Sequence, residues 1–507
     1  MSDLRTVNAR LRQLLADKDE LIASQDTLLG MQRDQLTGKD ELIAEQAKLI
    51  ALVEEQNAEL RRRLGLDSTN SSTPPSTDSI AAKAKRHKAN SERKRSPNRR
   101  PGGQKGHPGS GLELAAQVDD TLPIEPEQCS TCGEHLDTDS PREGFTPVQQ
   151  WDIPPVTLTK IQFDLMRRRC SAGHVTQAPA PAGVAGPVCY GPHVRAFTAH
   201  IAYRGHVSME RTAEMLAELF GAPVSTGFVA SCLTRLSAQL AGFETGLKQA
   251  LATTARLHHD ETPVPVNGAT AYVYTARTTD LIWYGAHQTR THEALDGFDI
   301  LPRFAGVLIR DDWHGYHKYS DPTRGGMVAH VQLCCAHLMR ELKAVWESDP
   351  AGQAWAEQMR QTVKKARRTV DTAIERGVDS LSPTMMESLR DLYLNTAQQG
   401  VTANTHGTAG RSHDAYKLAK RMRERVDQVL YFTLDFDTEW TNNPAEQAIR
   451  MAKLQAKISG SWRSMRGLAA FCRIRSYIAT AKAHGVEVFT ALRNAFLGDP
   501  WSIPTTA

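Results

Sequence analysis

The sequence lacks any run of about 18 apolar residues, the length that a membrane-spanning helix needs. Its first residues, MSDLRTVNARLRQLL, are polar and do not resemble a signal peptide. Cysteine is scarce, with eight among 507 residues, and such a chain favours free thiols or metal ligands over disulfides. We therefore expect a cytoplasmic protein with no membrane span, large enough for about three domains.

Charge is nearly balanced overall, at +4, but it is unevenly distributed. Residues 83–105 carry ten lysines and arginines against one acid, Glu92. A segment of this kind does not fold on itself, and it predicts contact with a polyanion, most simply nucleic acid. The alternative is a solvated linker, because residues 67–112 are also rich in serine, proline and glycine. The predicted DNA contacts here are Arg93, Lys94, Arg95, Arg99 and Arg100.

Residues 1–66 carry pairs of leucine and isoleucine at seven-residue intervals, and KDELIASQ at 18–25 returns as KDELIAEQ at 39–46. A strict seven-residue period predicts a left-handed coiled coil and hence at least a dimer. Glutamine and lysine alternate with the apolar pairs, which lowers stability and sets register. The alternative is a single amphipathic helix packed on its own protein.

Residues 113–185 contain two pairs of metal-ligand side chains. Cys129 and Cys132 form a CxxC pair, and Cys170 with His174 forms a CxxxH pair. Thiolates and imidazole at these spacings suit one structural Zn²⁺ in a zinc-ribbon-like domain. The alternative is buried reduced cysteines with His174 at the surface. The other cysteines are unpaired by spacing and are expected in the core: Cys189, Cys232, Cys334, Cys335 and Cys472.

Residues 186–250 have a helical period, and a turn containing Gly221 between two helices resembles a helix-turn-helix as much as a structural helix pair. Short runs rich in β-formers follow at 255–260, 271–276 and 281–286, which predict an antiparallel meander. In this interpretation Asp260 ends the first strand, and Asp311 ends the fourth, within the buried strand GVLIRDD at 306–312, which finishes in two aspartates.

A further helix is predicted within TNNPAEQAIRMAKLQAKISGS, residues 441–461. Asn443 is predicted to cap this helix, with Pro444 in its first turn. Steps of four, three and four residues place one acid at the head of a cationic face: Glu446, Arg450, Lys453 and Lys457. Glu446 would face a divalent cation bound with Asp260 and Asp311, and the three cations would face DNA phosphates. The alternative is that these acids are ordinary solvated side chains.

The chain resembles the bacterial insertion-sequence-66 (TnpC-like) transposases. The resemblance covers nearly the whole chain and rests on these blocks: NSSTPPSTDS (70–79), GGQKGHPG (102–109), the CxxC region, HHDETPVPV (258–266), RDDWHGYHKY (310–319), CCAHLMREL (334–342) and NNPAEQAIRMAKLQAKISGSWRS (442–464).

This resemblance implies a multidomain α+β protein with a ribonuclease-H-like α/β catalytic core at 251–344 and 431–465. A helical insertion at 345–430 and a C-terminal helical region at 466–507 complete the expected organisation. Asp260, Asp311 and Glu446 match the DDE triad, with Asp312 as the alternative second acid. His337 matches a family block and is either an auxiliary residue near the scissile phosphate or a structural one.

The implied activity is cleavage of transposon ends and transfer of the 3′-hydroxyl into target DNA, with two Mg²⁺ ions per active site or Mn²⁺ in their place. A bacterial, nucleoid-associated location is expected, and further transposon-encoded proteins are conceivable partners. Two other functions stay open: a non-catalytic DNA-binding protein derived from a decayed transposase, and a nuclease of the same fold that cuts without joining.

Overall fold

The computed structural model describes residues 2–64, 112–154, 156–184, 186–405 and 414–504. The five predicted DNA contacts between Arg93 and Arg100 lie outside the described residues. The chain divides into two compact units. The larger takes residues 88–336, 366–390 and 425–507, and the smaller takes residues 1–87, 337–365 and 391–424.

A mixed five-stranded sheet forms the centre of the larger unit. Its strands are β3 (Arg256–Val266), β4 (Ala269–Arg277), β5 (Ile282–His287), β6 (Val307–Arg310) and β7 (His330–Leu333). They are ordered β5-β4-β3-β6-β7; β3, β4 and β5 are antiparallel neighbours, whereas β6 and β7 run parallel to β3. The predicted meander is confirmed. Asn267 and Gly268, both with positive φ, make the two-residue turn between its first strands.

The prediction that Asp260 ends the first strand is wrong, because β3 continues to Val266 and Asp260 pairs with Thr275 of β4. What ends near Asp260 is the pairing with β6, whose last register partner on β3 is His258. Beyond this point β3 has no β6 neighbour, and the missing N–H groups of Pro263 and Pro265 therefore cost no ladder bonds. Asp311 does follow the last residue of its strand.

Two C-terminal helices cover the sheet. Helix α13 (Asn443–Ser459) packs against β3 and β4, and α14 (Met465–Ala483) packs against β5. Side chains of α14 also bond to the backbone of this edge strand: Thr480 Oγ1 accepts from Ile282 N at 3.1 Å, and Ser476 Oγ accepts from Tyr284 N at 2.8 Å. The edge of the sheet is thereby covered, and two of its amides are satisfied. Helix α15 (Val488–Phe496) follows.

The helical character predicted for 186–250 is found from Pro192 onward. These residues form α3 (Pro192–Ala199), a π-helical turn (His200–Arg204), α4 (Met209–Phe220), α5 (Thr226–Gln239) and α6 (Ala241–Ala252). Ser208 and Ser225 cap α4 and α5 by accepting from backbone amides, and Gly221 ends α4 with φ of 60°. The helix–turn–helix arrangement is therefore present, while a role in reading DNA stays a prediction.

The described residues of 112–154 and 156–184 contain little regular structure beyond the hairpin of β1 (Arg167–Arg169) and β2 (Val175–Gln177). Between β5 and the second part of the sheet lies α7 (His292–Phe298). The helical character predicted for 345–430 is found among its described residues. The helices there are α8 (Cys335–Ser348), α9 (Ala354–Glu375), α10 (Pro383–Ala403), α11 (Asp414–Glu424) and α12 (Val426–Val429).

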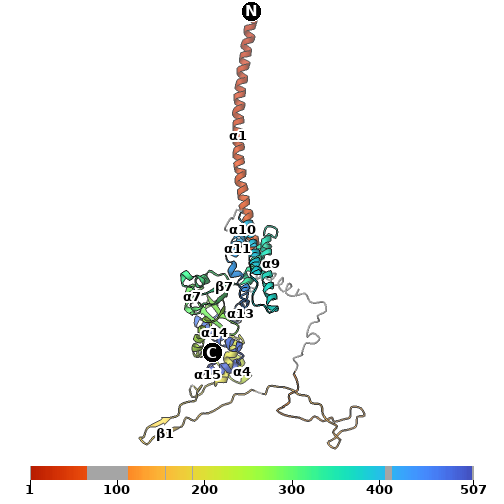
Figure 1. Ribbon diagram of the computed structural model, residues 1–507, viewed down its shortest axis with the longest axis vertical. Coiled ribbons are helices and arrows are strands. Elements are labelled where there is room, and N and C mark those ends of the chain that lie inside the picture. The colour runs from red at the N-terminus through yellow and green to blue at the C-terminus, as the bar shows by residue number, and fades with distance from the viewer. Residues whose placement is uncertain (1, 65–111, 155, 185, 406–413, 505–507) are drawn as a thin grey trace. The chain divides into compact units, whose positions relative to one another are not determined.

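The long N-terminal helix is confirmed as α1 (Ser2–Leu64; Figure 1). Its stripe of leucine and isoleucine side chains is 53–62% exposed in the single chain, at Leu14, Leu15, Leu21, Ile22, Leu28, Leu29, Leu36, Leu42, Ile43, Leu49 and Ile50. Burial of so regular an apolar stripe is the usual driving force for coiled-coil association. No helix among the described residues is long and apolar enough to cross a lipid bilayer.

Deleting residues 1–66 is expected to lower the oligomeric state, because the apolar stripe is then lost. Light scattering of the purified protein measures the mass. Glutamine in place of Leu21, Leu28, Leu42 and Leu49 should give the same loss, while the off-stripe changes Asp19→Gln and Asp26→Gln should not. An unchanged mass after the deletion would contradict the coiled coil.

Candidate active site

Asp260 lies in a cluster of acids contributed by different elements of the larger unit. Its carboxylate accepts a hydrogen bond from Glu261 N at 2.9 Å. Burial raises the pKa of Asp260 well above its usual range, and the charges of Glu261, Asp311 and Glu446 raise it further. Asp260 on β3 therefore interacts electrostatically with the other two predicted catalytic acids, Asp311 just after β6 and Glu446 on α13.

Asp311 and Asp312 have different surroundings, and this difference bears on which of them serves the site. Asp311 accepts from Trp313 N at 3.0 Å, and its Oδ2 lies 3.8 Å from Arg290. The Asp312 carboxylate is only 12% exposed, and it contacts three cationic or basic groups: Arg425 Nη1, His317 Nε2 at 3.3 Å and Arg310 Nη1 at 3.7 Å. Asp312 is thus committed to an ion-pair cluster, which favours Asp311 as the second acid.

Glu261 adds a fourth carboxylate that sequence reasoning missed. Its side chain is 2% exposed, accepts from Arg290 Nε at 2.8 Å and from the Tyr316 hydroxyl, and faces a network that includes His259. Burial and the charge of Asp311 raise the pKa of Glu261 to about 7, while Arg290 and Tyr316 oppose that rise. The guanidinium of Arg290 also stacks on the Trp313 ring at 4.3 Å.

No local sequence pattern could identify the residues that surround Glu261. Arg290 is a single cation in the loop between β5 and α7, and Tyr316 follows β6 in a short helical turn. Since the Tyr316 hydroxyl donates its hydrogen to Glu261, the Nδ1 of His259, at 2.9 Å, must donate to the Tyr316 oxygen. Burial lowers the pKa of His259 to about 3, so the imidazole is neutral. The one available signal was that Glu261 directly follows Asp260.

Glu446 is the fourth residue of α13, and its amide donates to Asn442 O at 3.1 Å. The prediction that Asn443 caps this helix is wrong by one position: Asn442 is the N-cap, and its side chain bonds elsewhere. Further along α13, Arg450 and Lys457 are exposed and Lys453 is half-buried. Burial lowers the pKa of Lys453, and the charges of Asp260 and Glu446 partly offset this. Lys453, on the predicted cationic face of α13, therefore interacts electrostatically with both Asp260 and Glu446.

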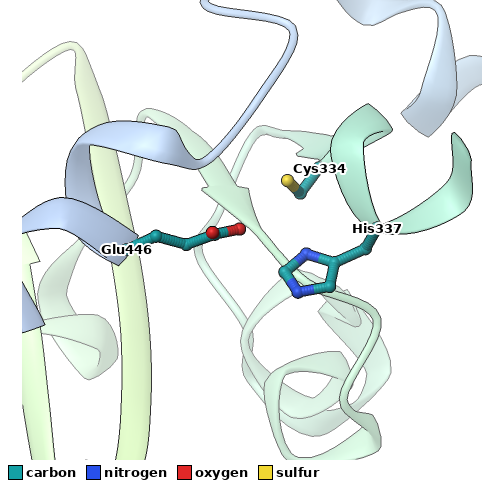
Figure 2. Close-up of side chains that lie close together, drawn as sticks. All are labelled: Cys334, His337 and Glu446. Carbon is teal, nitrogen blue, oxygen red and sulfur yellow. The ribbon is translucent and has the colours of Figure 1, made fainter. Parts of the chain in front are cut away.

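Figure 2 shows the Glu446 carboxylate near Cys334, at the end of β7, and His337, in the first turn of α8. The ligand atoms of these three side chains lie within 4.8 Å of one another. Among the described residues no other trio of potential ligands is as close, so Asp260, Asp311 and Glu446 do not all meet at one point. The thiol of Cys334 and the imidazole of His337 suit softer ions such as Zn²⁺. The carboxylates of Asp260, Asp311 and Glu446 instead offer the oxygen ligands that Mg²⁺ prefers.

The predicted zinc ligands occur as two tight turns. Gly133, with φ of 76°, donates to Cys129 O at 2.9 Å, and Gly173, with φ of 86°, donates to Cys170 O at 3.0 Å. Backbone hydrogen bonds from Cys132 and Thr131 lower the pKa of the Cys129 thiol. Cys170 Sγ lies 3.7 Å from His174 Nδ1. Each pair is assembled, but the two pairs are not brought together as one group.

The site thus combines carboxylates from a mixed sheet with Glu446 of the covering helix α13, whose later turns carry cations, and such oxygen ligands suit divalent cations. Comparison with known proteins is more specific: residues 187–470 match the family model described as "Transposase IS66 family". The match covers more than half of the 507 residues, and the chain belongs to this family. Residues 5–113 match a family of unknown function. No curated protein matches the chain.

The raised pKa values of Asp260 and Glu261 predict how the metal-free site affects stability. Above about pH 4, where free acids titrate, the folded state holds protons that the unfolded state has released, and for Glu261 this window extends to about pH 7. These acids therefore cost stability as pH rises through that window. Asp260→Asn should stabilise the metal-free protein increasingly over this range, as measured by thermal melts.

Adding Mg²⁺ at pH 7 should raise the melting temperature of the wild type and not that of Asp260→Asn. Asp299→Asn is the matched control, since Asp299 is exposed at the end of α7 in a left-handed conformation that asparagine tolerates. A stability difference between wild type and Asp260→Asn that is independent of pH would contradict the raised pKa of Asp260.

Proposed function

We propose that this protein is a metal-dependent DDE transposase that cleaves the ends of a transposon and transfers the 3′-hydroxyl into target DNA. The observation that carries the proposal is the mutual charge interaction of Asp260 with Asp311 and Glu446, within the segment that matches the transposase family. A buried acid whose pKa is raised by neighbouring acids is costly without a cation, and this cost is a usual mark of a functional site.

The sheet supports a ribonuclease-H-like core for this activity. Three antiparallel strands are followed by two strands parallel to the first, and the first acid lies on the central strand β3. Asp311 follows the neighbouring strand β6, and Glu446 comes from a helix that packs on β3. This arrangement supplies acids from three elements to one region of the sheet.

Asp260, Asp311 and Glu446 would hold two Mg²⁺ ions, or Mn²⁺, once the three carboxylates close around them. Bound ions would activate the attacking oxygen and stabilise the leaving one. Side chains of α13 would supply the contacts to DNA. Lys453 would neutralise phosphate charge next to the acids, while Arg450 and Lys457 would hold the DNA backbone further along α13.

We further propose that α1 forms a homo-oligomer of at least two chains and that the basic segment around Arg93–Arg100 adds DNA contacts. Cys129, Cys132, Cys170 and His174 would hold one structural Zn²⁺ if the two turns close on each other. His337 stays an auxiliary candidate. A cytoplasmic, nucleoid-associated location and accessory transposon-encoded partners also remain proposals. The alternatives are a same-fold nuclease that cuts without joining and a non-catalytic DNA-binding protein.

Labelled transposon ends incubated with the protein and Mg²⁺ test the proposed activity. Asp260→Asn, Asp311→Asn and Glu446→Gln should each lower both cleavage and strand transfer by at least ~100-fold, while DNA binding persists, because each removes a metal ligand. The matched control is Asp299→Asn, which should act as the wild type does. Cleavage that is unchanged in the three variants would overturn the proposal, and cleavage without joined product would favour the nuclease.

Metal analysis tests the zinc proposal separately. The purified protein should contain about one Zn²⁺ per chain, and Cys129→Ser should lose that zinc on mild chelation and bind DNA more weakly. The prediction that Cys189 lies in the core is wrong, because its side chain is exposed. Cys189→Ser, outside the predicted ligand set, is therefore the control. If metal analysis finds no zinc in the purified protein, the zinc site is refuted.

A further inference from the structure

Asn442 is fully buried and sits at the N-cap of α13 without capping it. Its side chain instead crosses to β3, where Nδ2 donates to His259 O at 2.8 Å and Oδ1 lies 3.1 Å from His258 Nδ1. Its backbone amide donates to Cys334 Sγ at 3.1 Å. One residue thus bonds to the central strand, to the end of β7 and to the start of α13.

The chemistry of these contacts fixes the orientation of the amide. A backbone carbonyl can only accept, so the group facing His259 O must be the NH₂ of Asn442, and its oxygen must face His258. His258 Nδ1 therefore carries a hydrogen and donates it. Burial lowers the pKa of His258 to about 4, so the ring is neutral near neutral pH, and the bond to Asn442 Oδ1 selects the tautomer with hydrogen on Nδ1. Both polar ends of the buried amide are satisfied.

These bonds act on the residues next to two of the catalytic candidates. His258 and His259 directly precede Asp260 on β3, and Asn442 O accepts from Glu446 N in the first turn of α13. Asn442 lies 183 positions along the chain from the carbonyl that it binds. A direct tie between strand and helix matters here, because Asp260 and Glu446 repel each other when no cation is present.

We infer that Asn442 is a positioning residue, which holds α13 on β3 so that Glu446 and Asp260 are spaced for a shared divalent cation. The inference rests on the proposed function. Removing the amide would let the helix start shift relative to the strand, and a displacement of ~1 Å at a catalytic group is enough to cost ~100-fold in rate. Partners of this kind, one step removed from metal ligands, typically contribute about 10–100-fold in metal affinity or activity.

The test compares Asn442→Ala with Asn443→Ala, the matched change at the adjacent and exposed asparagine. Asn442→Ala should lower the single-turnover cleavage rate by ~10–100-fold and raise the Mn²⁺ concentration for half-maximal rate, with DNA affinity within about twofold of wild type. Asn443→Ala should change none of these quantities. Circular dichroism and thermal melts report whether each variant is folded.

A second variant covers the case in which Asn442→Ala does not fold. His258→Ala leaves the bond between Asn442 and His259 O in place, and it should give a smaller rate loss with the same rise in the Mn²⁺ requirement. A folded Asn442→Ala with wild-type rate and Mn²⁺ requirement would overturn the inference. So would a rate loss that only follows the folded fraction, because that is the behaviour of a purely structural residue.

Mn²⁺ affinity measured by calorimetry without DNA separates this inference from the proposed function. Weaker Mn²⁺ binding in Asn442→Ala, with no cleavage even by the wild type, would support the positioning role and refute the transposase activity. Cleavage by the wild type, with equal Mn²⁺ binding in the wild type and in Asn442→Ala, would support the transposase activity and overturn the positioning role of Asn442.

Discussion

Electrostatic repulsion among carboxylates in and beside a buried sheet is the constraint on which the rest of the site depends. Burial raises the pKa of Asp260, and the charges of Glu261, Asp311 and Glu446 raise it further; burial and the charge of Asp311 likewise raise the pKa of Glu261. The fold tolerates this because cations and hydrogen-bond donors are placed around it. Arg290 and Tyr316 bind Glu261, and Lys453 lies within reach of the charges of Asp260 and Glu446. A divalent cation would relieve the same repulsion and supply chemistry as well.

The surrounding elements can be understood as supports for this cluster. Helix α13 carries Glu446 and Lys453, and Asn442 anchors the beginning of that helix on β3. Helix α14 covers the edge strand β5 and bonds to two of its amides, which helps to hold the antiparallel half of the sheet in place. The Asp312 cluster with Arg425 and His317 fixes the chain just after Asp311. Each support joins segments that are far apart in sequence.

Local patterns predicted much of this fold. The heptad repeat predicted α1, the β-rich runs predicted the meander, and the Pro444 region predicted α13, because each signal lies within a short window. The extent of β3 was missed, since its continuation to Val266 depends on pairing with β4 and on proline tolerance where β6 is absent. Glu261, Arg290, Tyr316 and Asn442 were missed as site residues because their roles arise only from tertiary contacts. The choice between Asp311 and Asp312 likewise depends on which partners surround each carboxylate.

The most direct test is a crystal structure of the protein with transposon-end DNA and Mn²⁺, located by anomalous scattering. The central claim predicts ion density bound by carboxylate oxygens of Asp260, Asp311 and Glu446 next to a DNA phosphate. Ions held only by Cys334, His337 and Glu446, with Asp260 left outside the coordination shell, would contradict it.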